Sequence, residues 1–286
     1  MHITWVQADS SLDVVSPGGF AGGVTSESVL SSRYSRNPAL ADLARTLGLV
    51  ERQGVGVDRM YSEMVALGHR RPLIREEAGP RIRTRLVGGN PLTAVVSVMS
   101  AVEPVSRQRD VRVALTVHVL IRDGFAAAAT VADLLQVPPE EAEEALDVVA
   151  QCTIDAESVI RPGSGGLWLP AAASVRRATA DPPALQIAQR RGLLTWWRPD
   201  AEGAKRLVRA WLAVSDRISS GDFADVTSYT NQGALQVLNR LAADGVLRRG
   251  DAARGRRAHF VAVATPSPSP GSGYTSPRLP DAGAPS

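Results

Sequence analysis

The sequence predicts an α+β protein that ends in two winged helix-turn-helix units and a disordered tail. Three observations lead to this fold class: alternating segments typical of strands near the N-terminus, two successive sets of three amphipathic helices followed by a hairpin, and a final stretch rich in proline, serine and glycine. With 286 residues, the chain is long enough for several cores. We therefore predict domains over residues 1–90, 91–180 and 181–264, and a disordered tail over 265–286.

Composition excludes several classes of protein and site. The formal net charge is only +3, so charge must be judged region by region before nucleic acid is inferred. Cys152 is the single cysteine and the four histidines are scattered, which argues against a disulfide framework and against a metal site. We find no signal peptide and no apolar run of membrane-spanning length, and we expect a cytoplasmic protein without a membrane partner.

The strands of the first domain are predicted from alternation. Residues 2–6 and 12–15 read as a hairpin, and residues 74–86 as a further strand. Three arginines point to one side of that strand, toward either phosphate or solvent, and we favour solvent: Arg81, Arg83 and Arg85. Residues 92–105 are rich in β-branched side chains, and we predict a strand there as well.

Two helices lie between these strands. Asn37 is expected to cap the first, Pro38 to occupy its first turn and Gly48 to end it. Its predicted buried face consists of Leu40, Leu43, Ala44 and Leu47, and that of the second helix of Val57, Met60, Tyr61, Met64 and Leu67. Gly54 and Gly56 open the second helix, where free N–H groups suit an anion. The alternative is a plain tight turn, because the spacing alone is a weak motif.

Several groups of residues occur in order along this domain: Ser16-Pro17-Gly18-Gly19-Phe20, Gly23-Val24-Thr25, Ser35-Arg36-Asn37-Pro38, Leu49-Val50-Glu51 and Gly54-Val55-Gly56-Val57-Asp58-Arg59-Met60. Together they resemble the C-terminal part of the ATPase-like domain in bacterial ATP-binding transcriptional regulators, the RecG-type helicase C-terminal domain of the GHKL ATPase class. The resemblance implies a partial α/β sandwich with a mixed sheet. It also implies ATP as a ligand, held by Pro17, Gly18, Gly19, Arg36, Asn37, Gly54 and Gly56.

The sequence departs from that family at its start. The family's metal–nucleotide site needs a Glu and an Asn from an upstream helix, and no such helix precedes His2. We therefore expect an N-terminally shortened domain, with a sheet edge covered by a dimer contact or by a missing segment. No catalytic residue and no metal ligand is assigned. Glu51 and Asp58 are the nearest carboxylates to the glycine loop, and Asp58 is explained more simply as a first-turn partner of the helix dipole.

The second domain has the pattern of a winged helix. Helices are predicted over residues 110–123, 130–135 and 138–149, followed by a hairpin with strands at 159–161 and 167–169. The third helix carries five acidic residues, Glu140, Glu141, Glu143, Glu144 and Asp147. Such a surface repels phosphate, so we expect a spacer or dimerisation role rather than DNA binding.

The third domain repeats this pattern with different chemistry. Helices are predicted from Ala201, over residues 222–226 and over 230–241, followed by a basic hairpin. We expect DNA contacts from the third helix and the hairpin through Gln232, Gln236, Asn239, Arg240, Arg248, Arg249, Arg254, Arg256 and Arg257. The alternative is a solvated, arginine-rich hairpin beside a helix used only for packing.

These expectations favour a transcriptional regulator that binds double-stranded DNA through the third domain, with a degenerate ATP-binding domain and a possible homodimer. One alternative is an ATPase that acts with DNA. The other is a protein–protein adaptor that uses the acidic helix as its contact face.

Overall fold

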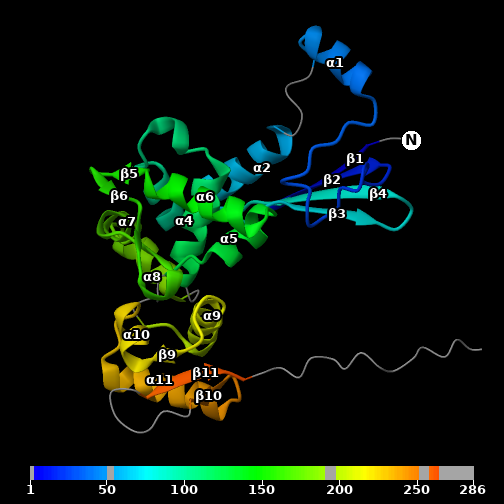
Figure 1. Ribbon diagram of the computed structural model, residues 1–286. Coiled ribbons are helices and arrows are strands. Elements are labelled where there is room, and N and C mark those ends of the chain that lie inside the picture. The colour runs from blue at the N-terminus through cyan, green and yellow to red at the C-terminus, as the bar shows by residue number, and fades with distance from the viewer. Residues whose placement is uncertain (1–2, 50–54, 191–197, 251–257, 264–286) are drawn as a thin grey trace, which may run out of the picture.

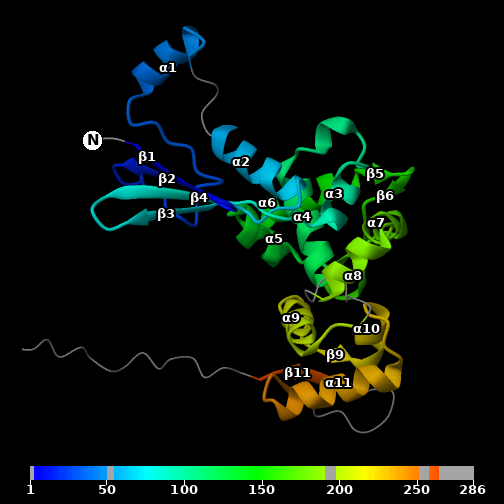
Figure 2. The ribbon, with the colours of Figure 1, turned by 180° about the vertical axis from the view of Figure 1, so that it is seen from behind.

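The computed structural model describes residues 3–49, 55–190, 198–250 and 258–263. Within these ranges the chain is a mixed α+β protein with small antiparallel sheets, which confirms the predicted class. A four-stranded sheet projects from one side of a helical body, and helix α1 (Pro38–Thr46) lies beyond it at the top (Figures 1 and 2). The C-terminal elements form the opposite end.

The sheet has the order β1-β2-β4-β3, and its strands are β1 (Thr4–Ala8), β2 (Ser11–Pro17), β3 (Leu73–Glu77) and β4 (Arg81–Val87). The hairpin predicted at the N-terminus is confirmed. The single strand predicted over 74–86 is wrong, because the chain turns back at Gly79, whose φ is +82°. The mixed sheet that the resemblance implied is also wrong. β2 and β3 run the same way, but β4 separates them and pairs antiparallel with both.

Helix α1 has the predicted ends but not the predicted packing. It begins at Pro38 and is followed by Gly48, whose φ is +68°. Asn37 occupies the capping position without a side-chain hydrogen bond to the helix. The leucines predicted to be buried are 55–62% exposed, because the helix stands away from the body and none of the described residues packs over them (Figure 1): Leu40, Leu43 and Leu47.

The region predicted as a strand over 92–105 contains helix α3 (Thr93–Met99) instead. Its buried residues are Ala94, Val95, Val98 and Met99. Val95, Val98 and Met99 follow Ala94 by one, four and five positions, and this spacing puts all four side chains on one face of a helix. In a strand the same residues would be divided between two faces. The β-branched composition was therefore misleading, and burial of the apolar face outweighs the β-propensity of the three valines.

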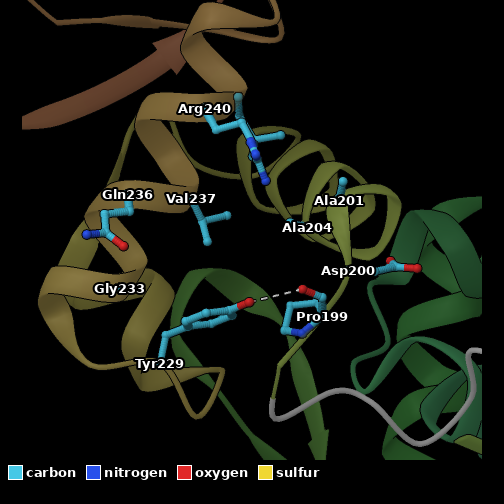
Figure 3. A pocket seen from close by; sticks show the side chains of 10 residues that line it. Pro199, Asp200, Ala201, Ala204, Tyr229, Gly233, Gln236, Val237 and Arg240 are labelled. Atoms are coloured by element: carbon cyan, nitrogen blue, oxygen red, sulfur yellow. Dashed lines mark hydrogen bonds between the residues drawn. The ribbon is translucent and has the colours of Figure 1, made fainter.

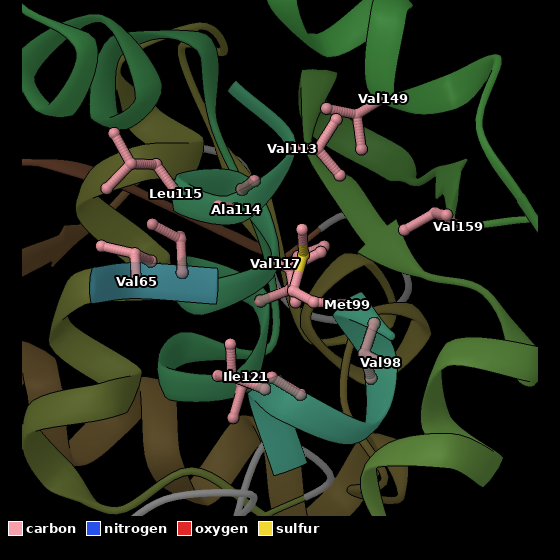
Figure 4. Close-up of a cluster of buried hydrophobic side chains, with 14 of the residues drawn as sticks. Val65, Val98, Met99, Val113, Ala114, Leu115, Val117, Ile121, Val149 and Val159 are labelled. Carbon is pink, nitrogen blue, oxygen red and sulfur yellow. The ribbon is translucent and has the colours of Figure 1, made fainter. Parts of the chain in front are cut away.

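Helix α2 (Val55–Ala66) belongs to the main core. Tyr61 and Val65 are buried there, whereas Leu67, predicted to be buried, is exposed. In the same core lie residues of α3 and of helices α4 (Val111–Asp123), α5 (Ala128–Leu135) and α6 (Pro139–Ala150). Figure 4 shows Val65 of α2 together with side chains of α3, α4 and α6. The first two predicted domains thus share one core, and the boundary at 90/91 stays a prediction.

The middle of the chain follows the predicted element order. Asp110 caps α4 by accepting the Arg112 N–H, and Gly124 ends it with a φ of +80°. Helix α5 begins at Ala128 rather than at Thr130. The smaller elements are η1 (Val105–Arg107), β5 (Thr153–Ile154), β6 (Glu157–Ser158), β7 (Ile160–Pro162), η2 (Ser164–Gly166), β8 (Trp168–Pro170), α7 (Ala172–Ala178) and α8 (Pro182–Arg190).

The C-terminal unit is built from α9 (Ala201–Leu212), β9 (Ile218–Ser219), α10 (Ser220–Asp225), α11 (Asn231–Ala243), β10 (Leu247–Arg249) and β11 (His259–Ala262). The three strands form a sheet with the order β10-β11-β9. Ser219 and Asp222 make a capping box at α10, and the Thr230 hydroxyl accepts the Gly233 N–H at α11.

The C-terminal unit is fixed to the middle of the chain by apolar and ionic contacts. Trp211 of α9 shares a second core with Phe125, Leu167 and Leu169. Asp123, whose side chain is only 3% exposed, pairs with Arg206 of α9 at 3.0 Å and with its neighbour Arg122. Because a buried carboxylate needs charged partners, these ion pairs hold α9 against the end of α4.

The Gln136 side chain joins the first unit to the turn after α5. Gln136, at φ +58°, accepts the Leu30 N–H at 2.7 Å and donates to the Ser26 carbonyl at 3.1 Å. Leu30 is itself buried in the main core. The 26–30 segment is therefore held by a helix end far away in the sequence.

Candidate functional site

The glycine turn after β2 lies beside an arginine, as the resemblance implied. Gly18 has a φ of +91° and donates its N–H to the Pro80 carbonyl at 2.8 Å. Arg36 donates to the Gly19 carbonyl at 2.8 Å. Of the predicted nucleotide ligands, the structure therefore brings Pro17, Gly18, Gly19 and Arg36 together.

The other predicted nucleotide ligands are not part of this group. Asn37 is exposed before α1, and Gly56 is exposed in the first turn of α2. Gly54 lies outside the described residues. No hydrogen bond among the described residues joins Gly56 to the glycine turn.

A cavity of about 440 Å³ borders the glycine turn. Gly19 and Phe20 form one wall, Tyr34 lies along the loop before α1, and Val57 and Ile82 come from α2 and β4. This size falls in the usual range for small-molecule sites. Among the described residues that line it, Gly19 is the one predicted nucleotide ligand.

Carboxylates near this cavity are already engaged. Asp58 accepts both of its hydrogen bonds from Arg33, at 2.7 and 3.0 Å, which agrees with a structural role. Glu76, missed in the sequence, accepts the Phe20 N–H at 3.2 Å, and a Cβ added to Gly19 would lie 2.3 Å from its oxygen. A side chain at position 19 would therefore make the end of the Glu76 side chain move. A negative group at the turn also weakens its attraction for phosphate.

Two arginines of the β4 stripe, Arg83 and Arg85, are paired with carboxylates on the sheet. Arg83 lies between Glu77 at 2.7 Å and Asp13 at 3.4 Å, and Arg85 approaches Asp13 at 3.7 Å. The hydrogen bond from Arg83 holds the pKa of the Glu77 carboxyl below its ordinary value. The preference for a non-phosphate role of this stripe agrees with these ion pairs.

The outer face of α11 is exposed as the sequence predicted. Gln232, Gln236 and Arg240 are all exposed, whereas Ala234, Leu238 and Leu241 are buried on the opposite side. Figures 1 and 2 place α11 along the lower end of the molecule, away from the sheet and from α1. The predicted polar residues therefore share one surface that solvent reaches.

The hairpin beside α11 contributes two arginines of different character. Arg248 is exposed, and its guanidinium has no hydrogen-bond or ion-pair partner within the described ranges. Arg249 donates to the Asn239 side chain at 2.8 Å and lies over the Phe260 ring, 6.0 Å from its centre. Asn239 and Arg249 are thus occupied with each other. Arg254, Arg256 and Arg257 lie outside the described residues.

The acidic helix of the middle unit is exposed along its outer side. Its carboxylates are those of Glu140, Glu141, Glu143, Glu144 and Asp147. His118 of α4 is mostly buried, and burial lowers the pKa of its imidazole. Among the described residues no group of acidic, histidine and cysteine side chains is arranged to hold a metal ion. None of the described helices combines the length and apolar character needed to cross a membrane.

In comparisons with known proteins, two parts of the chain match family models. Residues 7–83 match the family described as "Putative ATP-dependent DNA helicase recG C-terminal". Residues 93–177 match a "Family of unknown function (DUF5635)". The ATPase-like resemblance of the first unit is therefore confirmed. The search of curated proteins gave no match.

The fold has a solved counterpart. The crystal structure of the DIP2311 protein from Corynebacterium diphtheriae is 35% identical over 91% of this chain, with a TM-score of 0.75. This chain spans only 46% of that protein's length. The likeness therefore covers the fold of almost the whole chain, and leaves more than half of the other protein without a counterpart here.

Two parts of the candidate sites were missed in the sequence. The carboxylate of Glu76 lies at the glycine turn because the β3–β4 hairpin places it there. Because the sequence pattern predicts a single strand over this region, it does not identify Glu76. A second cavity lies between the ends of α9 and α11, near Tyr229. No local motif marks it, since its walls come from segments about 30 residues apart.

Proposed function

We propose that the chain is a DNA-binding transcriptional regulator and that its C-terminal unit is the winged helix that contacts the duplex. The exposed face of α11 carries this proposal. An α-helix fits the major groove, where glutamine pairs with adenine and arginine with guanine. Gln232 and Gln236 lie one turn apart on that face, with Arg240 one further turn along.

The hairpin supplies the second contact. In a winged helix the β10–β11 hairpin lies beside the recognition helix and reaches the backbone or the minor groove. Arg248 is available for a phosphate, whereas Arg249 supports the surface by orienting Asn239. The name of the family matched by residues 7–83 refers to a DNA helicase, which supports a nucleic-acid partner.

ATP is proposed as a signal rather than as a substrate. The cavity beside Gly19 and the family match favour nucleotide binding. The engagement of Asp58 with Arg33 leaves that carboxylate poorly placed to activate water. A fluorescent ATP analogue should therefore bind without turnover, and phosphate release at a rate above buffer would contradict this assignment.

Fluorescence anisotropy with a mixed-sequence duplex of about 30 base pairs tests the DNA proposal, at salt concentrations from about 50 to 200 mM. The affinity should fall steeply with salt. Arg248→Gln should weaken binding to every sequence and lower the salt slope by about one unit, because one phosphate contact is lost.

Arg176→Gln is the matched control, since Arg176 lies on α7 and pairs with Glu157 at 2.9 Å. It removes the same charge far from α11 and should leave the affinity unchanged. Equal effects of the two substitutions, or no binding at the lowest salt, would contradict the proposal. If the chain binds DNA as expected, selection of bound genomic fragments would define its sequence preference.

A further inference from the structure

The cavity between α9 and α11 has a volume of about 550 Å³. The small side chains of Ala201 and Ala204 in α9 face the side of α11 that bears Val237, and Tyr229 lies at the base of the cavity (Figure 3). Alanine at two positions of one helix leaves room that larger residues would fill. The volume lies within the range of small-molecule sites, whose walls are mostly apolar.

One cation lies at this cavity without a partner in the described parts of the chain. Arg240 extends toward the space between α11 and α9 in Figure 3, and none of the described residues forms a hydrogen bond or ion pair with its guanidinium. A guanidinium beside apolar walls attracts an anion more strongly than one in open water.

Two other polar groups around the cavity, those of Asp200 and Tyr229, are already engaged in hydrogen bonds. Asp200 uses its carboxylate to cap α9 by accepting the Gly203 N–H at 2.7 Å, and Figure 3 shows its side chain turned away from the cavity. The Tyr229 hydroxyl donates to the Pro199 carbonyl at 3.3 Å, which holds its ring across the base. The ring therefore offers a fixed apolar face, and Arg240 is the charged group left to orient a ligand.

We propose that this cavity binds a small organic acid with a flat apolar body. The carboxylate would lie on the Arg240 guanidinium, whose planar donors match a carboxylate in two parallel hydrogen bonds. The body would lie against Val237 and the ring of Tyr229, where an aromatic ligand gains offset stacking. Ala201 and Ala204 set the width of the space.

The site has a consequence for DNA that rests on the proposed function. Arg240 belongs to the same helix as the residues proposed to enter the major groove, and Gln236 borders both surfaces. A bound carboxylate neutralises that arginine, and removal of one cation weakens phosphate and base contacts. The acid is therefore expected to release the duplex.

Isothermal titration calorimetry with 2-naphthoate and its uncharged analogue 2-naphthamide tests the site on the full chain. The acid should bind at least about tenfold more tightly than the amide, since only the acid pairs with a guanidinium. Arg240→Gln should remove this difference. Arg248→Gln, which removes an exposed arginine outside the cavity, should leave it unchanged.

Ala201→Phe gives a second variant that does not depend on charge. Ala201 is exposed in the first turn of α9, so the larger side chain fills the cavity without entering the core, and binding should be lost. Equal binding of acid and amide, or full binding by both Arg240→Gln and Ala201→Phe, would overturn the proposal.

The DNA arm is measured separately by anisotropy with 2-naphthoate present. Release of duplex from the wild-type chain, but not by 2-naphthamide, supports the coupling. Naphthoate binding without any DNA binding would overturn the proposed function and leave the ligand site standing. If saturating naphthoate leaves the affinity for DNA unchanged, the coupling between ligand binding and DNA release is overturned, but the ligand site and the proposed function are not.

Discussion

The middle unit and the C-terminal unit share a plan of three helices before a hairpin but expose opposite surface chemistry. In each, three helices precede a hairpin, and the segment between the first two helices meets the last strand: Ala126 bridges Trp168 in one unit, and β9 pairs with β11 in the other. The third helix exposes carboxylates in α6 but amides and an arginine in α11. A shared element order therefore does not determine what a surface binds.

The two hairpins differ as well. The tip of the middle hairpin packs on the C-terminal unit, where a Cβ added to Gly165 would lie 2.5 Å from the Trp211 ring. Arg248 and Arg249 of the C-terminal hairpin are exposed. The middle hairpin therefore packs against the C-terminal unit, whereas the described arginines of the C-terminal hairpin are open to solvent.

The largest expected effect concerns the packed hairpin tip. Gly165→Ala forces an alanine into a φ of +66° and into the Trp211 ring, and should lower the free energy of unfolding by about 3 kcal/mol. Gly245→Ala is the matched control. Gly245 has a φ of +73° with no atom within 4 Å of an added Cβ, so about 1 kcal/mol is expected from the backbone alone.

Urea unfolding of both variants measures the difference. Equal losses would mean that the middle hairpin does not support the C-terminal unit, and the contrast between the two hairpins would fail.

A smaller free-energy change is expected, in this case for duplex binding, when the charge on the third helix of each unit is altered. Gln236→Glu gives α11 one carboxylate of the kind that α6 carries, and should weaken duplex binding about tenfold, or about 1.4 kcal/mol. Glu141→Gln removes one charge from α6 and should leave DNA affinity as it is. Anisotropy titrations of the two variants side by side decide this, and a stronger effect of Glu141→Gln would reverse the assignment of the two surfaces.

The smallest effect concerns the first helix of the middle unit. Burial alone would raise the pKa of Asp110, but hydrogen bonds from Arg112 and Arg107 outweigh it and the pKa is lowered. A carboxylate with a lowered folded-state pKa stabilises the protein above its unfolded pKa of about 3.9, and this contribution is lost as the pH falls further.

Asp110→Asn keeps a capping side chain but removes both ion pairs, so it should cost about 1 kcal/mol at neutral pH. The difference from wild type should shrink below about pH 4. Urea unfolding at neutral and acidic pH provides the measurement, and a difference that is constant with pH would argue against the ion pairs.

Local signals in the sequence predicted most of the elements. Helices with strong caps or a glycine end, such as those at Asp110 and Gly124, lie where their caps place them. The failures have tertiary causes. The leucines of α1 form a helical stripe that none of the described residues covers, and residues 93–99 form a helix because four apolar residues face one core.

The candidate sites were predictable to different degrees. The exposed polar face of α11 follows from its 3.6-residue period, which fixes which side is buried. The carboxylate of Glu76 at the glycine turn and the cavity near Tyr229 depend on segments that the sequence separates widely. Pairings of that kind leave no local pattern, because each partner looks like an ordinary polar or apolar residue on its own.

The Gln136 side chain limits how this molecule can be cut into pieces. An excised fragment of residues 1–90 would lose the amide that holds the Leu30 N–H and the Ser26 carbonyl, 106 and 110 residues away along the chain. It would also lose the apolar bed beneath Tyr61 and Val65. Truncations meant to isolate the ATPase-like region should therefore retain α4 to α6, or the glycine-rich segment will be studied in a shape that it does not have in the intact protein.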